Sequence, residues 1–414
     1  MTSEVRAKPN VISKLEVYEA WKRVKANKGA PGVDAESIEQ FETKLSRNLY
    51  KLWNRMSSGS YFPEALRRVE IPKKDGSMRP LGIPTVSDRV AQEVVRARLE
   101  PILEPLFHPD SYGYRPGKSA IDAIDVCRKR CWKNDWVLDV DIQKFFDSID
   151  HELLMRAVRK HSPERWITLY VERWLKAPVD CGGGRREPRS SGTPQGGVIS
   201  PLLANLFLHY AFDRWITQHY PSIQFERYAD DVVIHCASNR QAEQLREALS
   251  NRLAACGLSL QREKTRIVHC STANRREKFP TVSFTFLGYT FQPRAAKTRD
   301  GIMFTSFLPA ASTAALKQFR QKLRAKHLRR WVSVNIEEVA AQLNPFLAGW
   351  FRYFRCFYKS KLRRVYLSVD KRLVRWAANK YRWGLMKAVR WLQKLKIQQP
   401  TLFAHWKLLN PTYG

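Results

Sequence analysis

Two adjacent carboxylates in the middle of the chain are the residues best suited to chemistry. Asp230 and Asp231 lie between 225–228 and 232–236, two runs rich in β-forming residues. No Gly, Pro or Ser separates the pair from the second run, so the pattern predicts a β-hairpin with both acids at its tip. Binding a cation would stabilise carboxylates held there. A plain surface turn is the alternative, because Asp side chains also stabilise turns.

A third carboxylate is expected from a strand predicted at 137–142. Side chains alternate along a strand, so Asp139 and Asp141 lie on the same face and either could join the pair. Mg²⁺ prefers oxygen ligands and takes one or two carboxylates with substrate phosphates, so three acids suffice for two ions about 3.5–4 Å apart. The acids therefore predict nucleotidyl transfer.

The segment after that strand holds further candidates. Phe146 could stand beneath an incoming sugar, although a buried core position is the default for Phe. Asp150 is expected to cap a helix that begins at His151. We interpret Asp147, like Asp150, as structural.

Two loops could approach a phosphate. A hairpin predicted at 69–79 turns at Asp75-Gly76 and brings Lys73, Lys74 and Arg79 together. These three cations could bind a triphosphate, or they could simply be solvated on a surface turn. The Gly-rich segment 191–201 leads into a helix with a Ser cap and Pro at its first position. It lacks the Gly-Lys-Ser/Thr of a Walker loop, so it is weak evidence when taken alone.

The composition indicates a globular protein that binds polyanions. The 414 residues are 44% hydrophobic, enough for two or three packed domains, and the net charge is +33. Such a charge favours nucleic acid as the partner. No apolar stretch reaches the roughly 18 residues of a membrane-spanning helix, and no signal segment is apparent.

Cysteines and local patterns give smaller expectations. Seven scattered cysteines indicate reduced thiols and a cytoplasmic location, associated with the nucleoid if the source is bacterial. Cys127 and Cys131 are expected to pack in the core on one helix at 120–133 and not to bind zinc. Periodicity also predicts a helix over 11–28 and a strand-like segment at 282–291.

The last quarter of the chain differs from the rest. From residue 311 onward it holds 23 Lys and Arg but only three acids, and it is helical and rich in aromatic residues. We expect the cations to bind a phosphate backbone and most rings to pack a core, with Asn344-Pro345 starting or kinking one helix. The expected RNA-binding residues are Arg352, Arg355, Lys359, Lys361, Arg363 and Arg364.

Several ordered blocks resemble one family, the reverse transcriptases and maturases encoded by group II introns. They are 29–34, 79–84, Tyr112-Gly113-Tyr114-Arg115-Pro116-Gly117, 141–147, 192–197, Tyr228-Ala229-Asp230-Asp231, 286–289 and 343–350. The resemblance covers nearly the whole chain, and the order of the blocks makes it specific. It implies an α+β right-hand polymerase. Its expected parts are an N-terminal extension and fingers (1–135), a palm with an antiparallel sheet (136–310, with fingers contributions near 180–200) and a helical thumb or maturase domain with a short basic tail (311–414).

The resemblance also implies residue roles. The metal ligands would be Asp141, Asp230, Asp231 and the backbone carbonyl of Ile142, so it selects Asp141 over Asp139. The nucleotide-binding residues would be Lys73 and Arg79 on the triphosphate, Phe146 as the ribose gate, Gln195 and Gly196 beside nucleotide and template, and Lys264. The implied cofactors are two Mg²⁺ ions, with Mn²⁺ as a substitute, and the substrates are deoxynucleoside triphosphates.

The function that this family implies is RNA-directed DNA synthesis combined with intron binding. Group II intron RNA, an RNA template and a DNA primer or target DNA would be the partners, and the protein would assist splicing and copy the intron during retrohoming. The chain stops at Gly414 without the His and Cys ligands of a nuclease domain, so it resembles an endonuclease-lacking member. The alternatives are a splicing cofactor without polymerase activity and a reverse transcriptase adopted by the host for defence or repair.

Overall fold

A computed structural model describes residues 10–72, 78–162, 164–275, 279–298 and 300–409. The chain forms two compact units, each built from segments that are separate in sequence. The first unit comprises Met1–Ser119, Val140–Ile234 and Arg240–Arg266, and the second comprises Ala120–Asp139, His235–Asn239 and Ile267–Gly414. Within the described ranges, no helix is both long enough and apolar enough to cross a membrane.

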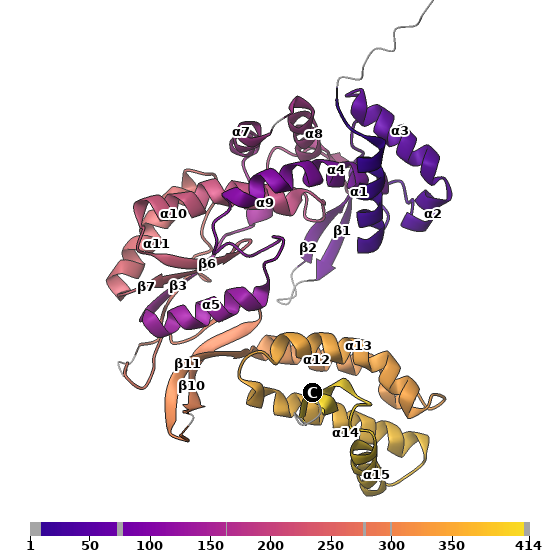
Figure 1. Ribbon diagram of the computed structural model, residues 1–414, viewed down its shortest axis with the longest axis vertical. Helices are drawn as coiled ribbons and strands as arrows, with labels where there is room; N and C mark the ends of the chain where they lie inside the picture. The colour runs from indigo at the N-terminus through magenta and orange to yellow at the C-terminus, as the bar shows by residue number, and fades with distance from the viewer. Residues whose placement is uncertain (1–9, 73–77, 163, 276–278, 299, 410–414) are drawn as a thin grey trace, which may run out of the picture. The chain divides into compact units, whose positions relative to one another are not determined.

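The first helices of the chain, labelled α1 and α2 in Figure 1, each begin directly after a residue whose side chain caps the helix. α1 spans Lys14–Asn27, and Ser13 caps it in a reciprocal pair with Glu16. The helix predicted over 11–28 therefore exists, but it starts at the capping residue and not at the first apolar one. Ser37 caps α2 (Ile38–Thr43) in the same way, with Gln40 as its partner.

Helices dominate the first unit. Its remaining helical segments are α3 (Leu45–Ser57), α4 (Val86–Leu103), η1 (Glu104–Leu106), α6 (Phe145–Ser148), α7 (His151–His161), α8 (Arg165–Lys176), α9 (Ser200–Leu208), η2 (His209–Asp213), α10 (Arg214–His219) and α11 (Asn239–Ala254). The first residue of α11, Asn239, is assigned to the second unit. η2 is a π-helical segment that joins α9 to α10 without a break. The cap predicted for α7 is confirmed, because Asp150 accepts a hydrogen bond from the Leu153 amide.

Two four-stranded sheets carry the predicted hairpins. β1 (Leu66–Pro72) and β2 (Met78–Ile83) pair antiparallel, in the sheet order β2-β1-β4-β5 with β4 (Val179–Asp180) and β5 (Arg186–Glu187). The tip of this hairpin, including Lys73 and Lys74, lies outside the described residues. The other sheet has the order β6-β7-β3-β8, from β6 (Gln224–Tyr228), β7 (Asp231–Cys236), β3 (Trp136–Asp141) and β8 (Arg266–His269).

The second unit combines a three-stranded sheet with helices. Its elements are α5 (Ala120–Lys133), β9 (Phe284–Phe286), β10 (Tyr289–Lys297), β11 (Met303–Ala311), α12 (Thr313–Ala325), η3 (Leu328–Arg330), α13 (Ile336–Phe354), η4 (Lys359–Leu362), α14 (Arg363–Lys380), α15 (Leu385–Gln398) and α16 (Ala404–Leu409). The strand-like segment at 282–291 is in fact a hairpin. Leu287 and Gly288 both have positive φ and form its tight turn, which pairs β9 with β10.

Aromatic rings form the core of the helical part of this unit, as the sequence predicts (α12 to α15, orange to yellow in Figure 1). Phe319 stacks on Phe346 at 5.0 Å, and its ring lies 4.5 Å from that of Trp350. Phe351 is fully buried. Asn344-Pro345 does not start a helix, because α13 is continuous through Pro345, and the alternative of a kink at this point stays a prediction. Asn344 instead donates a hydrogen bond to the Leu402 carbonyl.

A half-buried carboxylate connects three of these helices. Asp370 on α14 accepts hydrogen bonds from Lys396 Nζ (2.9 Å), His405 Nε2 (2.9 Å) and Trp406 Nε1 (2.8 Å). Burial alone would raise the pKa of Asp370, but the hydrogen bonds and charge of His405, with Trp406 and Lys396, hold it at about 2.

Replacing Asp370 with alanine is expected to lower the free energy of unfolding by about 2–3 kcal/mol, because its three donors lose their acceptor. A depressed pKa stabilises the fold above the ordinary Asp value, so the loss should be full above about pH 4 and should shrink as the pH falls toward 2. Urea unfolding at several pH values measures this. A constant difference down to pH 2 would contradict the assignment.

Candidate active site

The acid pair lies where the sequence predicts, at the tip of a hairpin. β6 ends at Tyr228, Ala229 and Asp230 make the turn, and Asp231 begins β7. Ala229 is buried and has φ of 57°, in the left-handed region that non-Gly residues rarely adopt. Asp230 is half-buried, whereas Asp231 is exposed. The two neighbouring acids therefore have different surroundings.

Asp141 is the last residue of β3 and is held by a segment far along the chain. Its carbonyl accepts a hydrogen bond from the Gln261 amide (2.8 Å), and its own amide donates to Thr265 Oγ1 (3.4 Å). Lys264, on the same segment, places Nζ 3.5 Å from Asp141 Oδ2. These contacts bring a cation and a carboxylate together at the strand end.

Asp141 and Asp230 line one cavity of about 670 Å³. Its other lining residues are Met78, Arg79, Pro80, Ile142, Gln143, Lys144, Phe145, Phe146, Asp147, Gln195, Gln261 and Lys264. All of them belong to the first unit. Seven of the residues predicted for metal or nucleotide binding are thus in one wall: Arg79, Asp141, Ile142, Phe146, Gln195, Asp230 and Lys264.

Other predicted residues lie elsewhere. Asp231 and Gly196 are in the described part of the chain but not in that lining, and Lys73 lies outside the described residues. The rival acid Asp139 is likewise absent from the lining, so the cavity distinguishes two acids that strand periodicity could not.

The electrostatics of the cavity suit a divalent cation. Burial raises the pKa of Asp230, and the neighbouring carboxylate of Asp141 raises it further, while Arg79 and Arg227 oppose the shift. A cation bound beside Asp230 would stabilise the charged form of this carboxylate, which burial and the nearby Asp141 disfavour. The oxygen donors of this wall therefore fit a hard cation such as Mg²⁺.

Arg79 and Gln195 form a chain of contacts across the cavity. Arg79 Nε donates to Gln195 Oε1, and Gln195 Nε2 donates to Asp147 Oδ1 at 3.2 Å. Our interpretation of Asp147 as purely structural is therefore too narrow, since this exposed carboxylate lies in the cavity wall and orients Gln195.

The Gly-rich loop packs too closely for side chains. A Cβ on Gly196, where φ is 123°, would lie 2.7 Å from the Gly82 carbonyl oxygen. A Cβ on Gly192 would lie 2.7 Å from the carbonyl oxygen of Asp147. The expected Ser cap is absent, because Ser200 is the first residue of α9 and its Oγ hydrogen-bonds to Thr193 Oγ1 instead. The loop therefore sets the position of Gln195.

Phe146 forms an aromatic part of the wall. It is 8% exposed and meets Phe145 edge-on, with ring centroids 5.3 Å apart. Phe146 is the second residue of the short helix α6, which begins directly after Lys144, whose φ is 45°.

Sequence reasoning missed some of the wall. Gln143 and Lys144 could have been found from their closeness to Asp141 in the chain. Gln261 carries no such signal, since backbone contacts between its segment and the end of β3 bring it there.

The six cations expected to bind RNA lie in the second unit. Arg352, Arg355, Lys359, Lys361, Arg363 and Arg364 are all exposed, and they run from the end of α13 through η4 to the start of α14. They are accessible to a ligand, and their role in RNA binding stays a prediction.

Comparison with known proteins gives two family matches and several relatives. Residues 71–291, more than half of the chain, match the reverse transcriptase (RNA-dependent DNA polymerase) family, and residues 316–395 match the group II intron maturase-specific domain. Protein YkfC of Escherichia coli K12 is 35% identical over 285 residues, which cover 59% of this chain and 74% of that protein.

Two relatives are named for introns. The group II intron-encoded protein LtrA of Lactococcus lactis is 31% identical, over 65% of this chain and 43% of LtrA. The putative COX1/OXI3 intron 1 protein of Saccharomyces cerevisiae is 26% identical, over 66% of this chain and 40% of that protein. The chain thus spans less than half the length of these two relatives.

The family match and the cavity point in the same direction. The matched region contains the acid hairpin, the strand that ends at Asp141 and the Gly-rich loop. The chain therefore belongs to the reverse transcriptase (RNA-dependent DNA polymerase) family, in the group that carries a group II intron maturase-specific domain.

Proposed function

We propose that this protein copies RNA into DNA by nucleotidyl transfer in the cavity that Asp141 and Asp230 line. The observation that carries the proposal is this pair of carboxylates in one wall with Arg79 and Gln195, inside the region that matches reverse transcriptases. The carboxylates suit metal ions and the guanidinium suits phosphates, and polymerases need both.

Two Mg²⁺ ions are the proposed cofactors. Their ligands would be the carboxylates of Asp141, Asp230 and Asp231 with the carbonyl of Ile142, and Mn²⁺ would substitute. Bound there, the ions would lower the pKa of the primer 3′-hydroxyl and neutralise charge on the departing pyrophosphate.

The remaining wall would bind and orient the nucleotide. Arg79, held by Gln195, would contact the triphosphate together with Lys73, and Lys264 would lie beside the departing pyrophosphate. Phe146 would pack against the sugar, while Gln195 and Gly196 would line the nucleotide and template. The chain would supply charge and orientation, and no protein base is required.

The second proposed activity is binding of group II intron RNA to assist splicing. The maturase-specific match at 316–395 and the excess of cations after residue 311 support it. We propose the division into 1–135, 136–310 and 311–414 as fingers, palm and thumb. The six exposed cations between Arg352 and Arg364 would contact the RNA backbone, whose charge dominates affinity.

Primer extension tests the polymerase. We expect labelled DNA primer on an RNA template to be extended with deoxynucleotides and Mg²⁺, and extension to stop when EDTA is added. Binding of RNA without any extension would favour the alternative, a splicing cofactor. Splicing of a group II precursor RNA at low Mg²⁺, with and without the protein, separates the two activities.

A further inference from the structure

A buried arginine precedes the catalytic hairpin tip and is paired within the fold. The side chain of Arg227 is 0% exposed and forms an ion pair with Asp213, which is 1% exposed. Its Nε donates to Asp213 Oδ1 (2.7 Å) and its Nη2 to Asp213 Oδ2 (2.6 Å). Nη1 donates to Asn205 Oδ1 (2.9 Å) and to the Ala229 carbonyl (3.3 Å).

The contact with Ala229 reaches the turn itself. Ala229 has φ of 57° and directly precedes Asp230, the acid that lines the cavity. An Ala in this conformation costs about 1 kcal/mol or more, so the surroundings must impose it. The guanidinium therefore connects Asp213 and Asn205 to the Ala229 carbonyl, and it is placed to hold the shape of the tip.

The two partners of Arg227 come from one helix with an unusual turn. Asn205 lies on α9, and Asp213 ends the π-helical segment η2. In a regular α-helix, the eight steps from Asn205 to Asp213 would leave the two side chains about 80° apart around the helix axis. A π turn takes up one extra residue, so the rotation is that of about seven steps and the side chains lie only about 20° apart, in the opposite sense. The π segment thus brings both side chains to the same face, toward Arg227.

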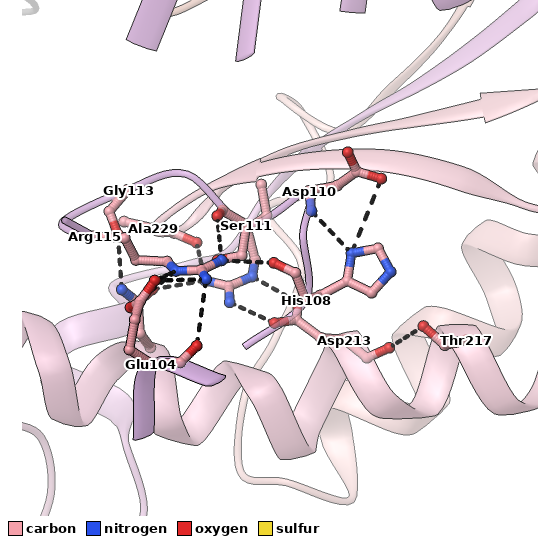
Figure 2. A network of polar contacts seen from close by, with 11 residues as sticks. Glu104, His108, Asp110, Ser111, Gly113, Arg115, Asp213, Thr217 and Ala229 are labelled. Carbon is pink, nitrogen blue, oxygen red and sulfur yellow. Dashed lines mark hydrogen bonds and ion pairs between the residues drawn. The ribbon is translucent and has the colours of Figure 1, made fainter. Parts of the chain in front are cut away.

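A loop braces the other side of the hairpin (Figure 2). The Arg227 amide donates to the Asp110 carbonyl (2.9 Å), and the Tyr112 amide donates to the Arg227 carbonyl (2.8 Å). Asn205 Nδ2 donates to the Gly113 carbonyl at 2.7 Å. A Cβ on Gly113 would lie 2.5 Å from the Ala229 nitrogen, so the loop touches the turn directly.

Arg115 fixes this loop in turn. Its Nη1 donates to the carbonyls of His108 (2.6 Å) and Ser111 (2.7 Å), and its guanidinium pairs with Glu104. Figure 2 shows these groups around the turn residue Ala229. The turn is therefore enclosed by a hydrogen-bonded frame and not by apolar packing alone.

We propose that Arg227, Asp213 and Asn205 are positioning residues that hold the Ala229 turn, and with it Asp230, in the geometry that binds the metal ion. The proposal rests on the proposed polymerase function. Stability alone is a weak reason for such a cluster, because apolar residues of similar volume commonly replace a buried ion pair without loss. Groups behind metal ligands, in contrast, typically change metal affinity or activity 10- to 100-fold.

The main test removes both charges at once. Arg227→Met with Asp213→Leu leaves no unpaired buried charge, so the variant is expected to unfold within a few degrees of the parent. Mn²⁺ titration, followed by the electron paramagnetic resonance signal of free Mn²⁺, should show about tenfold weaker binding. In primer extension kcat should fall about 10- to 30-fold, while KM for the deoxynucleotide and RNA affinity stay within about twofold.

A matched control removes another ion pair of the same unit. Arg96 pairs with Glu93 and Glu100 on α4, and Glu93 also pairs with Arg23, but none of these residues lines the cavity. Arg96→Met with Glu93→Leu should leave Mn²⁺ affinity and kcat within about twofold of the parent. Unchanged Mn²⁺ affinity in the Arg227/Asp213 variant, or an equal loss in the control, would overturn the proposal.

A second variant keeps the test valid if the double replacement does not fold. Asn205→Leu removes the hydrogen bonds to Arg227 and Gly113 without stranding a charge, and it should weaken Mn²⁺ binding about threefold. Normal Mn²⁺ binding in folded Asn205→Leu would then count against the proposal. A parent that binds Mn²⁺, with variants that bind it less, but extends no primer would refute the polymerase and leave the positioning role supported.

Discussion

Replacing Asp230 and Asp231 together with alanine is expected to lower primer extension by about 10³-fold or more, while RNA affinity stays within about twofold. Primer extension should fall because metal ions neutralise charge in the transition state of nucleotidyl transfer, and these carboxylates would hold the ions. RNA affinity should be retained because it depends on Lys and Arg, which are concentrated after residue 311. Single-turnover extension at equal RNA occupancy measures both.

Two acids of β3 provide the matched comparison. Asp139 and Asp141 lie on one face of the strand, but only Asp141 lines the cavity. Asp141→Asn should lower extension about as strongly as the double variant, whereas Asp139→Asn should stay within about threefold of the parent. Full activity in Asp141→Asn or in the double variant would show that the metal site does not lie in this cavity.

Replacing Phe146 with valine is expected to raise the use of ribonucleotides relative to deoxynucleotides about 10²-fold, measured as the ratio of their kcat/KM values. The ring is 8% exposed, and its contact with Phe145 restricts its movement. A rigid ring beside the sugar would exclude a 2′-hydroxyl by its volume, and a smaller side chain would relieve that clash. Extension with each ribonucleotide in turn gives the ratio.

The control for this experiment is another buried ring of the same unit. Phe207 on α9 is 4% exposed and does not line the cavity. Phe207→Val should destabilise the fold by a comparable amount, and it should leave sugar selectivity unchanged. If both variants relax selectivity equally, a general loosening of the fold explains the effect and Phe146 is not the gate.

Local patterns predicted the elements whose formation depends on neighbours in the chain. The 69–79 hairpin, the helix at 120–133, the cap at Asp150 and the hairpin of the acid pair are all present. Errors arose where a backbone conformation or a partner overrode the pattern. The 282–291 segment folds back at Leu287-Gly288, and α13 continues through Pro345 and does not begin there.

The sequence by itself determined the chemical class, since carboxylates within β runs, basic residues in excess and ordered blocks are properties of the linear chain. Strand periodicity left Asp139 and Asp141 equivalent, and only the tertiary structure shows that Asp141 alone of the two lines the cavity, where the distant segment with Gln261 and Thr265 bonds to its backbone. The tertiary structure also shows the contacts of Arg227 on which its proposed positioning role rests. The partner of a charged residue in a buried strand cannot be predicted from the sequence pattern, and here a π turn, which leaves no mark in that pattern, aligns the partner.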